Sequence, residues 1–358
     1  MSLAYQEPFN KAKAMVFPRQ VLAGHGVIER TGEVCEDLGL GRRIAIVTGD
    51  KTINVAGKHV ASLLTRRSFR VEIESIGGAT IQNLDALIKR IRRFRPSAIA
   101  GVGGGSKIDL AKMAAARFQV PLISIPTAAS HDGISSPRAS IKGSGMSHSM
   151  EGVTPVGIIA DTQIISHAPY RMLASGCADV VSNATALRDW ELAAGCGKDT
   201  ISTTAMILSR YAFTDIMQNA SKIRKYDEMG TWIAVRPIIA SGLAMGAAGS
   251  SRPASGSEHM FSHALDALGR GNALHGEQCG LGAIMMMALH GGDWRAIRRT
   301  LMKLGCPTKA SQVGLTPEDI VEALLLSKKM RKDRYTILDE KPMNKERAIR
   351  IAKYTGVI

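Results

Sequence analysis

The chain has 358 residues, of which 45% are hydrophobic and 22% are charged, and this balance predicts a folded protein of about two domains. No run of 18 apolar residues occurs, and Arg236 and Pro237 interrupt the longest apolar stretch, 232–249, which argues against a membrane span. The net charge is +15, but the basic residues are spread over predicted helix surfaces and aromatic residues make up only 4%, so we expect anionic metabolites as partners rather than nucleic acid.

The N-terminal segment and the cysteines bear on the cellular compartment. Residues 1–13 are polar and lack the apolar core of a signal peptide, so we expect a cytoplasmic protein. The cysteines are odd in number and none has CxxC spacing, which fits reduced thiols and argues against a disulfide scaffold or a cysteine-based zinc site. These residues are Cys35, Cys177, Cys196, Cys279 and Cys306.

Short apolar strands and amphipathic helices alternate along the first half of the chain. Such alternation predicts a Rossmann-like parallel sheet with helices on both faces. The strands are expected at residues 43–50, 71–76, 98–102, 121–125 and 156–160, and the helices at 27–38, 55–67, 84–94 and 108–118. An exposed hairpin is expected at residues 139–150.

Strand patterns end near residue 169, and only helical patterns follow. They cover residues 170–193, 200–225, 227–247, 256–268, 277–290, 293–304, 316–331 and 344–353. We therefore predict two domains, an α/β domain at residues 1–165 that binds a dinucleotide and an all-α domain at residues 166–358.

A glycine cluster connects the strand at 98–102 with the helix at 108–118. The cluster contains Gly103, Gly104 and Gly105, whose lack of a Cβ lets the backbone approach a ligand. The start of the helix suits a phosphate group, Ser106 can cap it, and a cation such as Lys107 is disfavoured there unless an anion is near. A pyrophosphate site is one interpretation and a flexible turn is the other, because the spacing departs from GxGxxG.

A second loop, residues 126–137, follows the next strand and reads PTAASHDGISSP. In parallel sheets, ligands bind beyond the carboxyl ends of the strands, and the loops at 49–50, 103–107 and 126–137 all lie at such ends. The last loop is rich in hydroxyl groups and contains one acid, Asp132, which suits hydrogen bonds to a sugar or polyol. An ordinary turn-rich loop is the alternative.

The helical half contains a candidate metal site. Its members are Asp179, His259, His263 and His275, and the first two histidines share a helix face at i, i+4 spacing. Two or three imidazoles with one carboxylate and an open position are typical of a catalytic zinc site. Because the chain has nine histidines, surface or core histidines with other partners remain the alternative.

Four motifs occur in the order GVGGGSKIDLAK, PTAASHDGISSP, GCADVVSNATALRDW and LHGEQCGLG. Together they resemble the superfamily of glycerol dehydrogenases, iron-type alcohol dehydrogenases and dehydroquinate synthases. PTAASHDGISSP, SRPASGSEHMFSHALD and RKDRYTIL resemble the family of archaeal sn-glycerol-1-phosphate dehydrogenases, which make the glycerophosphate backbone of lipids. The resemblance extends from Gly24 to Leu338 and implies a dehydroquinate synthase-like architecture.

The resemblance also implies roles for individual residues. Asp179, His259 and His275 match zinc ligands, Asp132 and His263 match catalytic and substrate-binding positions, and Asp179 lies near the substrate as well. Iron-type relatives carry a histidine where this chain has Asn183, which favours a three-ligand zinc site over a four-ligand iron site. Positions that match dinucleotide-binding residues are Asp50, Gly103, Gly104, Gly105, Ser106, Lys107, Thr127, Ala128, Ala129, Ser130 and Ser136.

The implied reaction is the reduction of dihydroxyacetone phosphate to sn-glycerol 1-phosphate by NADH or NADPH, with zinc polarising the C2 carbonyl. A glycerol dehydrogenase acting on unphosphorylated glycerol or dihydroxyacetone is the alternative, and a dehydroquinate synthase-type lyase is a further one. Asp50 disfavours a 2′-phosphate whereas Lys51 could accept one, so the sequence does not decide between NADH and NADPH. The resemblance suggests a homo-oligomer. Candidates for binding the substrate phosphate are Arg138, Lys142, Arg252 and His25.

Overall fold

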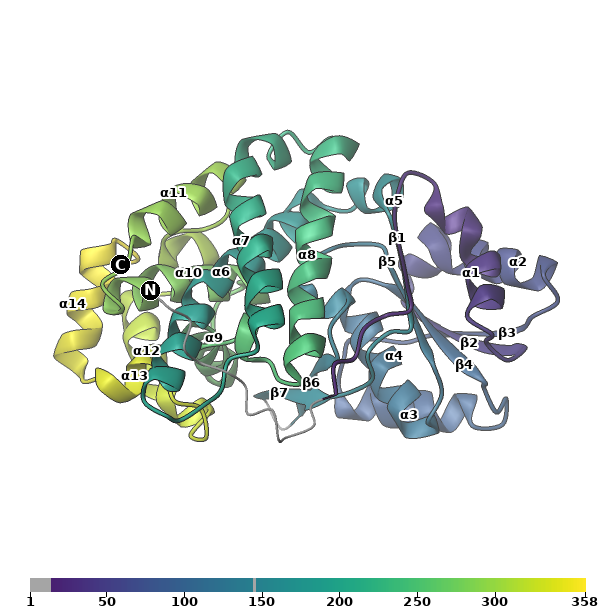
Figure 1. Cartoon of the computed structure of the whole chain (residues 1–358), viewed down its shortest axis with the longest axis horizontal. Helices are drawn as coiled ribbons and strands as arrows, with labels where there is room; N and C mark the ends of the chain where they lie inside the picture. The colour runs from purple at the N-terminus through teal and green to yellow at the C-terminus, as the bar shows by residue number, and fades with distance from the viewer. Residues whose placement is uncertain (1–13, 144–145) are drawn as a thin grey trace. The chain divides into compact units, whose positions relative to one another are not determined.

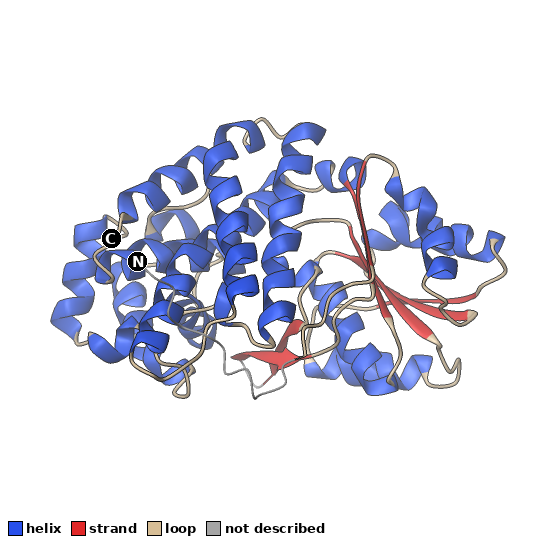
Figure 2. Ribbon diagram, viewed as in Figure 1, coloured by secondary structure: helices blue, strands red, loops and turns tan. Residues whose placement is uncertain are grey.

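The computed structural model describes residues 14–143 and 146–358 (Figures 1 and 2). Six strands form one parallel sheet in the order β1-β8-β5-β4-β2-β3, and β6 and β7 form a separate antiparallel pair. The strands are β1 (Gln20–Gly24), β2 (Arg43–Thr48), β3 (Arg70–Ser75), β4 (Ala98–Gly103), β5 (Leu122–Pro126), β6 (Arg138–Gly143), β7 (Met146–Glu151) and β8 (Gly157–Asp161).

Helices follow the strands in the first half of the chain and make up most of the second half. The helices of the first half are η1 (Val27–Arg30), α1 (Thr31–Asp37), η2 (Ile53–Gly57), α2 (Lys58–Arg66), α3 (Ile81–Ile91), α4 (Gly105–Phe118), η3 (Asp132–Ile134) and α5 (Thr162–Ser166). Those of the second half are α6 (Tyr170–Gly195), α7 (Thr203–Ile223), α8 (Glu228–Ala248), η4 (Arg252–Ala254), α9 (Ser257–Leu268), α10 (His275–Leu289), α11 (Trp294–Leu304), η5 (Ala310–Val313), α12 (Pro317–Met330), α13 (Ile337–Glu340) and α14 (Lys345–Thr355).

The predicted fold class is confirmed, because the chain combines a parallel sheet with a long all-helical part. The expected hairpin is also present as β6 and β7, although residues 144–145 lie outside the described residues. Strand β1 is an addition to the predicted elements. It pairs only with β8 at the edge of the sheet and is partly exposed, so its sequence lacks the apolar run of a central strand.

Alternate residues of each strand pack against helices on opposite faces of the sheet. In β2, Ile44 and Ile46 lie in a core cluster with side chains of α1 and α2, whereas Ala45 and Val47 lie in a second cluster with side chains of α3 and α4. Figure 2 shows helices on both sides of this sheet. Because the helices bury both faces, a ligand can reach the sheet at its edges, and the loops at the carboxyl ends of the strands form one of them.

The chain divides into two compact units by its internal packing. The α/β unit consists of Val16–Leu173 together with Tyr226–Gly242, the first part of α8. The helical unit consists mainly of Ala174–Lys225 and Leu243–Ile358. The α/β unit therefore includes a helical segment that is distant in sequence from every strand of the sheet.

Among the described residues, one helix, α8, is long and apolar enough to cross a membrane by length and composition alone. The interior of the protein covers 72% of its most apolar stretch. Its residues Ile239 and Ser241 contact the loop that follows β5 within the α/β unit. A core helix passes the same test of length and composition, and we describe α8 as a core helix.

A buried ion pair fixes α4 to the segments that follow β5. The Lys112 side chain is fully buried, and its ammonium group lies 3.3 Å from Oδ1 of Asp109 on the same helix. It also donates hydrogen bonds to the carbonyl oxygens of Gly133 and Arg138, and Oδ2 of Asp109 accepts one from the backbone N–H of Ser140. The helix that starts at the glycine cluster is therefore locked to the hydroxyl-rich loop and to β6.

Candidate functional site

The glycine cluster forms the junction between β4 and α4. A Cβ at Gly105 would lie 1.8 Å from Nε2 of His131, so this glycine makes room for the imidazole. Gly103 has a φ of +159° and lies against Lys107. A Cβ at Gly104 would meet no described atom within 4 Å, so open space remains beside the backbone at the N-terminus of α4. A phosphate group would be favoured there by the helix dipole and the free N–H groups.

Two details of this junction differ from the sequence-based expectation. Helix α4 begins at Gly105 instead of residue 108, and Gly104 is its N-cap. Ser106 therefore lies inside the first turn, and no side chain of the described residues caps the helix. An uncapped helix start has N–H groups that an anionic ligand can satisfy.

Lys107 and Asp50 both lie at the carboxyl edge of the sheet. The Lys107 side chain passes over Gly49 and donates a hydrogen bond to the carbonyl oxygen of Gly77, which follows β3. Burial lowers the pKa of the Lys107 ammonium group, against the attraction of Asp50. Asp50 is exposed, accepts a 2.5 Å hydrogen bond from the Ser75 hydroxyl, and follows β2, the direct neighbour of β4. An exposed carboxylate at this place suits ribose hydroxyls.

The hydroxyl-rich loop runs beside the glycine cluster. The backbone N–H of Thr127 donates to the carbonyl oxygen of Gly103 at 3.0 Å, which places the start of the loop against the end of β4. The side chains of Thr127, Ala129 and Ser136 are buried, whereas those of Ala128 and Ser130 are half-buried. Of these five residues, Ala128 and Ser130 are therefore the more accessible to a cofactor.

Asp132 and His131 have defined partners in the α/β unit. Oδ2 of Asp132 accepts a 2.7 Å hydrogen bond from the Ser241 hydroxyl of α8. Nδ1 of His131 accepts one from the backbone N–H of Gly133 at 2.9 Å. The contact of His131 with Gly105 was missed by sequence reasoning, and no local pattern indicates that this loop residue packs over the glycine cluster.

The open space at Gly104 gives a test of the cofactor site. Gly104→Ala is expected to leave the melting temperature nearly unchanged, because the new methyl group meets no described atom and the backbone φ of −73° is allowed for any residue. Binding of NAD(P)H, measured by fluorescence titration, is expected to weaken about tenfold or more, since losing one charge-assisted phosphate contact costs roughly 1.5–3 kcal/mol. Gly105→Ala serves as the contrast, because its clash with His131 should lower stability itself. If the affinity for NAD(P)H is unchanged in Gly104→Ala, the backbone at Gly104 does not belong to the cofactor site.

Four side chains of the helical unit form a group of metal donors. One donor atom each of Asp179 on α6, His259 on α9, and His275 and Cys279 on α10 all lie within 4.8 Å of one another. Oδ1 of Asp179 is 3.5 Å from Nε2 of His259 and 3.6 Å from Nε2 of His275. The His263 ring lies beside the group, with its centroid 6.4 Å from those of both other imidazoles. The structure thus brings the three sequence-predicted ligands together.

Outer hydrogen bonds orient both imidazoles. Nδ1 of His259 lies 2.9 Å from Oε1 of Glu258, which fits an N–H donating to the carboxylate, and Nε2 is the ring nitrogen that faces Asp179. Nδ1 of His275 lies 3.3 Å from the hydroxyl oxygen of Ser262, whose own proton is donated to Gln278. Such outer partners fix the tautomer that a metal ion needs.

Burial and neighbouring charges shift the pKa values of the side chains in and beside this donor group. Burial disfavours an imidazolium at His275, but Cys279 and Asp179 outweigh it and raise the pKa of His275 to about 9. His259 likewise has a raised pKa despite burial, and these imidazoles lower the pKa of the buried Cys279 thiol. At His263, burial and the nearby imidazoles lower the pKa to about 3, so its ring is neutral at physiological pH. Its buried Nδ1 has no hydrogen-bond partner among the described residues.

Cys279 is a member of the donor group that the sequence analysis did not name as a ligand. The scattered cysteines argue against a zinc site built from cysteines, and this stays a prediction, although the Cys279 sulfur lies 3.6 Å from Nε2 of His275 and could supply one further donor. The signal was present, since the two residues are four apart on one helix and share a face. Asn183, one turn beyond Asp179, is buried and is not part of the donor group. Carboxylate, imidazole and thiolate donors fit a zinc ion.

The basic residues predicted as phosphate binders mostly have other partners. Arg252 is bound to Asp199 at 2.5 Å, Arg138 donates to Ser149, and His25 lies 2.9 Å from Glu228. Lys142 is exposed on β6.

A different arginine of the helical unit stands out by its burial. Arg334 is only 6% exposed, and its guanidinium donates to the Ser251 hydroxyl and the Ser255 carbonyl oxygen just before α9. Burial, with the charges of Arg331 and Arg252, lowers its pKa to about 9. It contacts no carboxylate within residues 14–143 and 146–358, so a buried positive charge is left for an anion to pair.

Comparisons with known proteins agree with this geometry. Residues 22–169 match the model of a family described as iron-containing alcohol dehydrogenase. The chain is 48% identical over 349 residues to the glycerol-1-phosphate dehydrogenase (NAD(P)+) of Methanosarcina mazei, covering 98% of both chains. It is 43% identical over 350 residues to the protein of the same name from Thermoplasma volcanium, covering 98% of this chain and 99% of the other.

Solved structures with low sequence identity share the fold. Glycerol dehydrogenase from Schizosaccharomyces pombe superposes with a TM-score of 0.80 at 21% identity, covering 97% of this chain and 92% of the other. An iron-containing alcohol dehydrogenase from Thermotoga maritima gives a TM-score of 0.74 at 17% identity, covering 95% and 98%. These values confirm the architecture that the sequence motifs implied.

Proposed function

Because the chain belongs to the glycerol-1-phosphate dehydrogenase family, we propose that it reduces dihydroxyacetone phosphate to sn-glycerol 1-phosphate with NADH or NADPH. A hydride moves from the dihydronicotinamide to C2 of the ketone and a proton moves to its oxygen, which yields NAD(P)+ and the alcohol. The product would enter synthesis of a glycerophospholipid backbone. The donor group of Asp179, His259 and His275 is the observation that carries this proposal.

Those three residues would hold a divalent ion, with zinc as our choice, which supplies Lewis-acid chemistry at the C2 oxygen when bound. Glu258 and Ser262 hold the imidazole rings in the orientation that this requires. Three ligands from the protein leave a position for the substrate oxygen, provided that Cys279 stays a neighbour and not a fourth ligand.

His263 and Asp132 are our candidates for contact with the substrate. His263 is neutral, and a substrate hydroxyl would satisfy its buried Nδ1, which has no partner among the described residues. We therefore assign it hydrogen bonding that orients the substrate rather than release of a proton. Asp132, held in place by its hydrogen bond from Ser241, would hold or pass a proton at the reacting carbonyl group of the substrate.

The nucleotide would bind in the α/β unit. Gly103 to Lys107 would face the pyrophosphate at the start of α4, and Asp50 would accept hydrogen bonds from the adenosine ribose. Residues 127–130 and Ser136 would line the rest of the nucleotide site. The choice between NADH and NADPH stays open, and the cytoplasm and a homo-oligomer stay predictions.

Arg334 is our candidate for the substrate phosphate. A buried guanidinium without a carboxylate partner is costly unless an anion pairs with it, and a phosphate accepts two parallel hydrogen bonds from its planar fork. Ser255, whose carbonyl oxygen receives a hydrogen bond from Arg334, lies just before the helix that carries His259 and His263. The charge of Arg334 also contributes to the lowered pKa of His263, so the two groups are near each other.

A comparison of substrates tests the proposal. Dihydroxyacetone phosphate is expected to exceed dihydroxyacetone in kcat/KM by about 10²-fold, from roughly 1.5–3 kcal/mol for charge-assisted phosphate contacts. Arg334→Met should lower this ratio to near one, mainly by raising KM for the phosphorylated ketone, whereas Arg334→Lys should retain part of it. A preference for the unphosphorylated ketone would establish the glycerol dehydrogenase alternative, and chiral analysis of the product checks the sn-1 configuration.

A further inference from the structure

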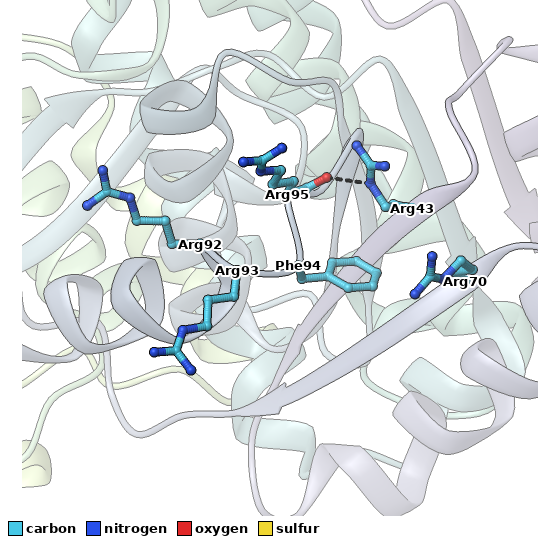
Figure 3. Close-up of a pocket in the computed structure, with 6 residues that line it drawn as sticks. All are labelled: Arg43, Arg70, Arg92, Arg93, Phe94 and Arg95. Carbon is cyan, nitrogen blue, oxygen red and sulfur yellow. Dashed lines mark hydrogen bonds between the residues drawn. The ribbon is translucent and has the colours of Figure 1, made fainter.

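A pocket of about 600 Å³ lies at the amino edge of the sheet in the α/β unit (Figure 3). Arg43 and Arg70 are the first residues of the neighbouring strands β2 and β3, and a segment between α3 and β4 supplies the rest of the lining. The lining residues are Arg43, Arg70, Arg92, Arg93, Phe94 and Arg95. Five arginines and one aromatic ring thus line one hollow.

This pocket is distinct from the proposed nucleotide site. The glycine cluster follows the carboxyl end of β4, whereas Arg92 to Arg95 precede its amino end at Ala98. A strand of six residues spans about 20 Å at roughly 3.3 Å per residue. The established chemistry of the family therefore leaves this basic pocket unexplained.

No carboxylate among the described residues neutralises the pocket. Two other arginines of the same unit are paired with acidic side chains, Arg30 with Glu33 and Arg90 with Glu74. Within residues 14–143 and 146–358, none of the five lining arginines contacts an acidic side chain. Their guanidinium groups place five positive charges around one hollow, and an anion bound there would reduce their mutual repulsion.

Part of the pocket is already fixed in position. Nε of Arg43 donates a 2.7 Å hydrogen bond to the carbonyl oxygen of Arg95, as the dashed line in Figure 3 shows. The backbone N–H of Arg43 and the Ser97 hydroxyl are 3.0 Å apart, and the Ser97 N–H donates to the Arg43 carbonyl oxygen. Arg95 has a φ of +49°, a conformation that few non-glycine residues adopt, and these bonds hold it. The turn that carries Arg95 is therefore fixed before any ligand arrives.

We propose that this pocket binds the polyphosphate chain of a small ligand of the nucleoside triphosphate class. Planar guanidinium forks match phosphate oxygens, and five of them balance the roughly four negative charges of a triphosphate. The volume lies within the range of small-molecule sites, roughly 300–1,000 Å³. The half-buried Phe94 ring, which lies between Arg93 and Arg70 in Figure 3, offers an apolar face to a base. Because all five arginines line a single hollow, a compact anion fits it better than an extended polymer or a membrane does.

Calorimetric titration tests this site on the full chain saturated with NADPH, so that the glycine cluster is filled. Tripolyphosphate and ATP are the probes, and each is expected to bind with a stoichiometry of about one per chain. Arg92→Gln/Arg93→Gln is expected to weaken binding about tenfold or more, because charge-assisted contacts are lost. The matched control is Arg188→Gln/Arg350→Gln, which removes the same charge from exposed positions of the helical unit and should bind normally. Dehydrogenase activity should be unchanged in both variants.

Three results would overturn the proposal. The first is the absence of saturable binding of either probe at 0.15 M salt, which would leave only screened surface attraction. The second is equal weakening in the two double variants, which would indicate net charge rather than a site. The third is binding of duplex DNA or anionic phospholipid vesicles that tripolyphosphate does not displace, which would assign the patch to a macromolecule or a membrane. Tighter binding of ATP than of tripolyphosphate supports the contact with Phe94, and equal binding supports the polyphosphate chain as the recognised group.

Discussion

The His259→Ala variant is expected to lose its bound metal ion and at least about 10³-fold of its kcat/KM. His259 supplies one of the clustered donor atoms, and its removal leaves Asp179 and His275 with too few partners to retain the ion. Loss of the Lewis acid removes several kcal/mol of charge stabilisation at the carbonyl, which corresponds to about three powers of ten in rate. Elemental analysis of the purified protein and steady-state kinetics measure the two effects.

Two control variants sharpen this result. His59→Ala removes an exposed imidazole in the α/β unit and should keep about one ion per chain. Cys279→Ala should also keep it if three ligands bind the metal and the thiol is only a neighbour. If His259→Ala keeps its full metal content, the proposed metal site is wrong. Loss of the ion in Cys279→Ala would show that four residues bind the metal.

Lys112→Met is expected to lower the free energy of unfolding by about 3–5 kcal/mol, the usual cost of removing one partner from a buried ion pair. Methionine has a similar shape but leaves the buried Asp109 carboxylate without its ammonium partner. It also leaves the carbonyl oxygens of Gly133 and Arg138 without the hydrogen bonds from Lys112. Urea denaturation followed by circular dichroism measures the change.

The exposed Lys58→Met provides the baseline, and its effect should stay within about 0.5 kcal/mol. The double variant Asp109→Asn/Lys112→Met should be more stable than Lys112→Met alone, because it removes the orphaned charge. If Lys112→Met cost less than about 1 kcal/mol, the ion pair would not be what locks α4 to the following loop.

Several site features could be predicted from local sequence. The alternation of apolar runs predicted the parallel sheet, and the position of the glycine cluster after a strand placed it at the carboxyl edge. Asp179, His259 and His275 were indicated by residue type and by resemblance, and the structure brings them within reach of one ion. Helix α4 starts earlier than expected because Gly104 adopts an extended N-cap conformation that no propensity rule specifies.

The sequence by itself determined the order and periodicity of the elements and the chemical types of the proposed ligands, because these depend on residues that are close in the chain. The tertiary structure decided which distant groups meet. Only folding places His131 over Gly105, adds Cys279 to the metal donors, and buries Arg334 against Ser251 and Ser255, about 80 positions away. Burial and pairing set the energy of such charged groups, and both depend on packing between segments that no local pattern encodes.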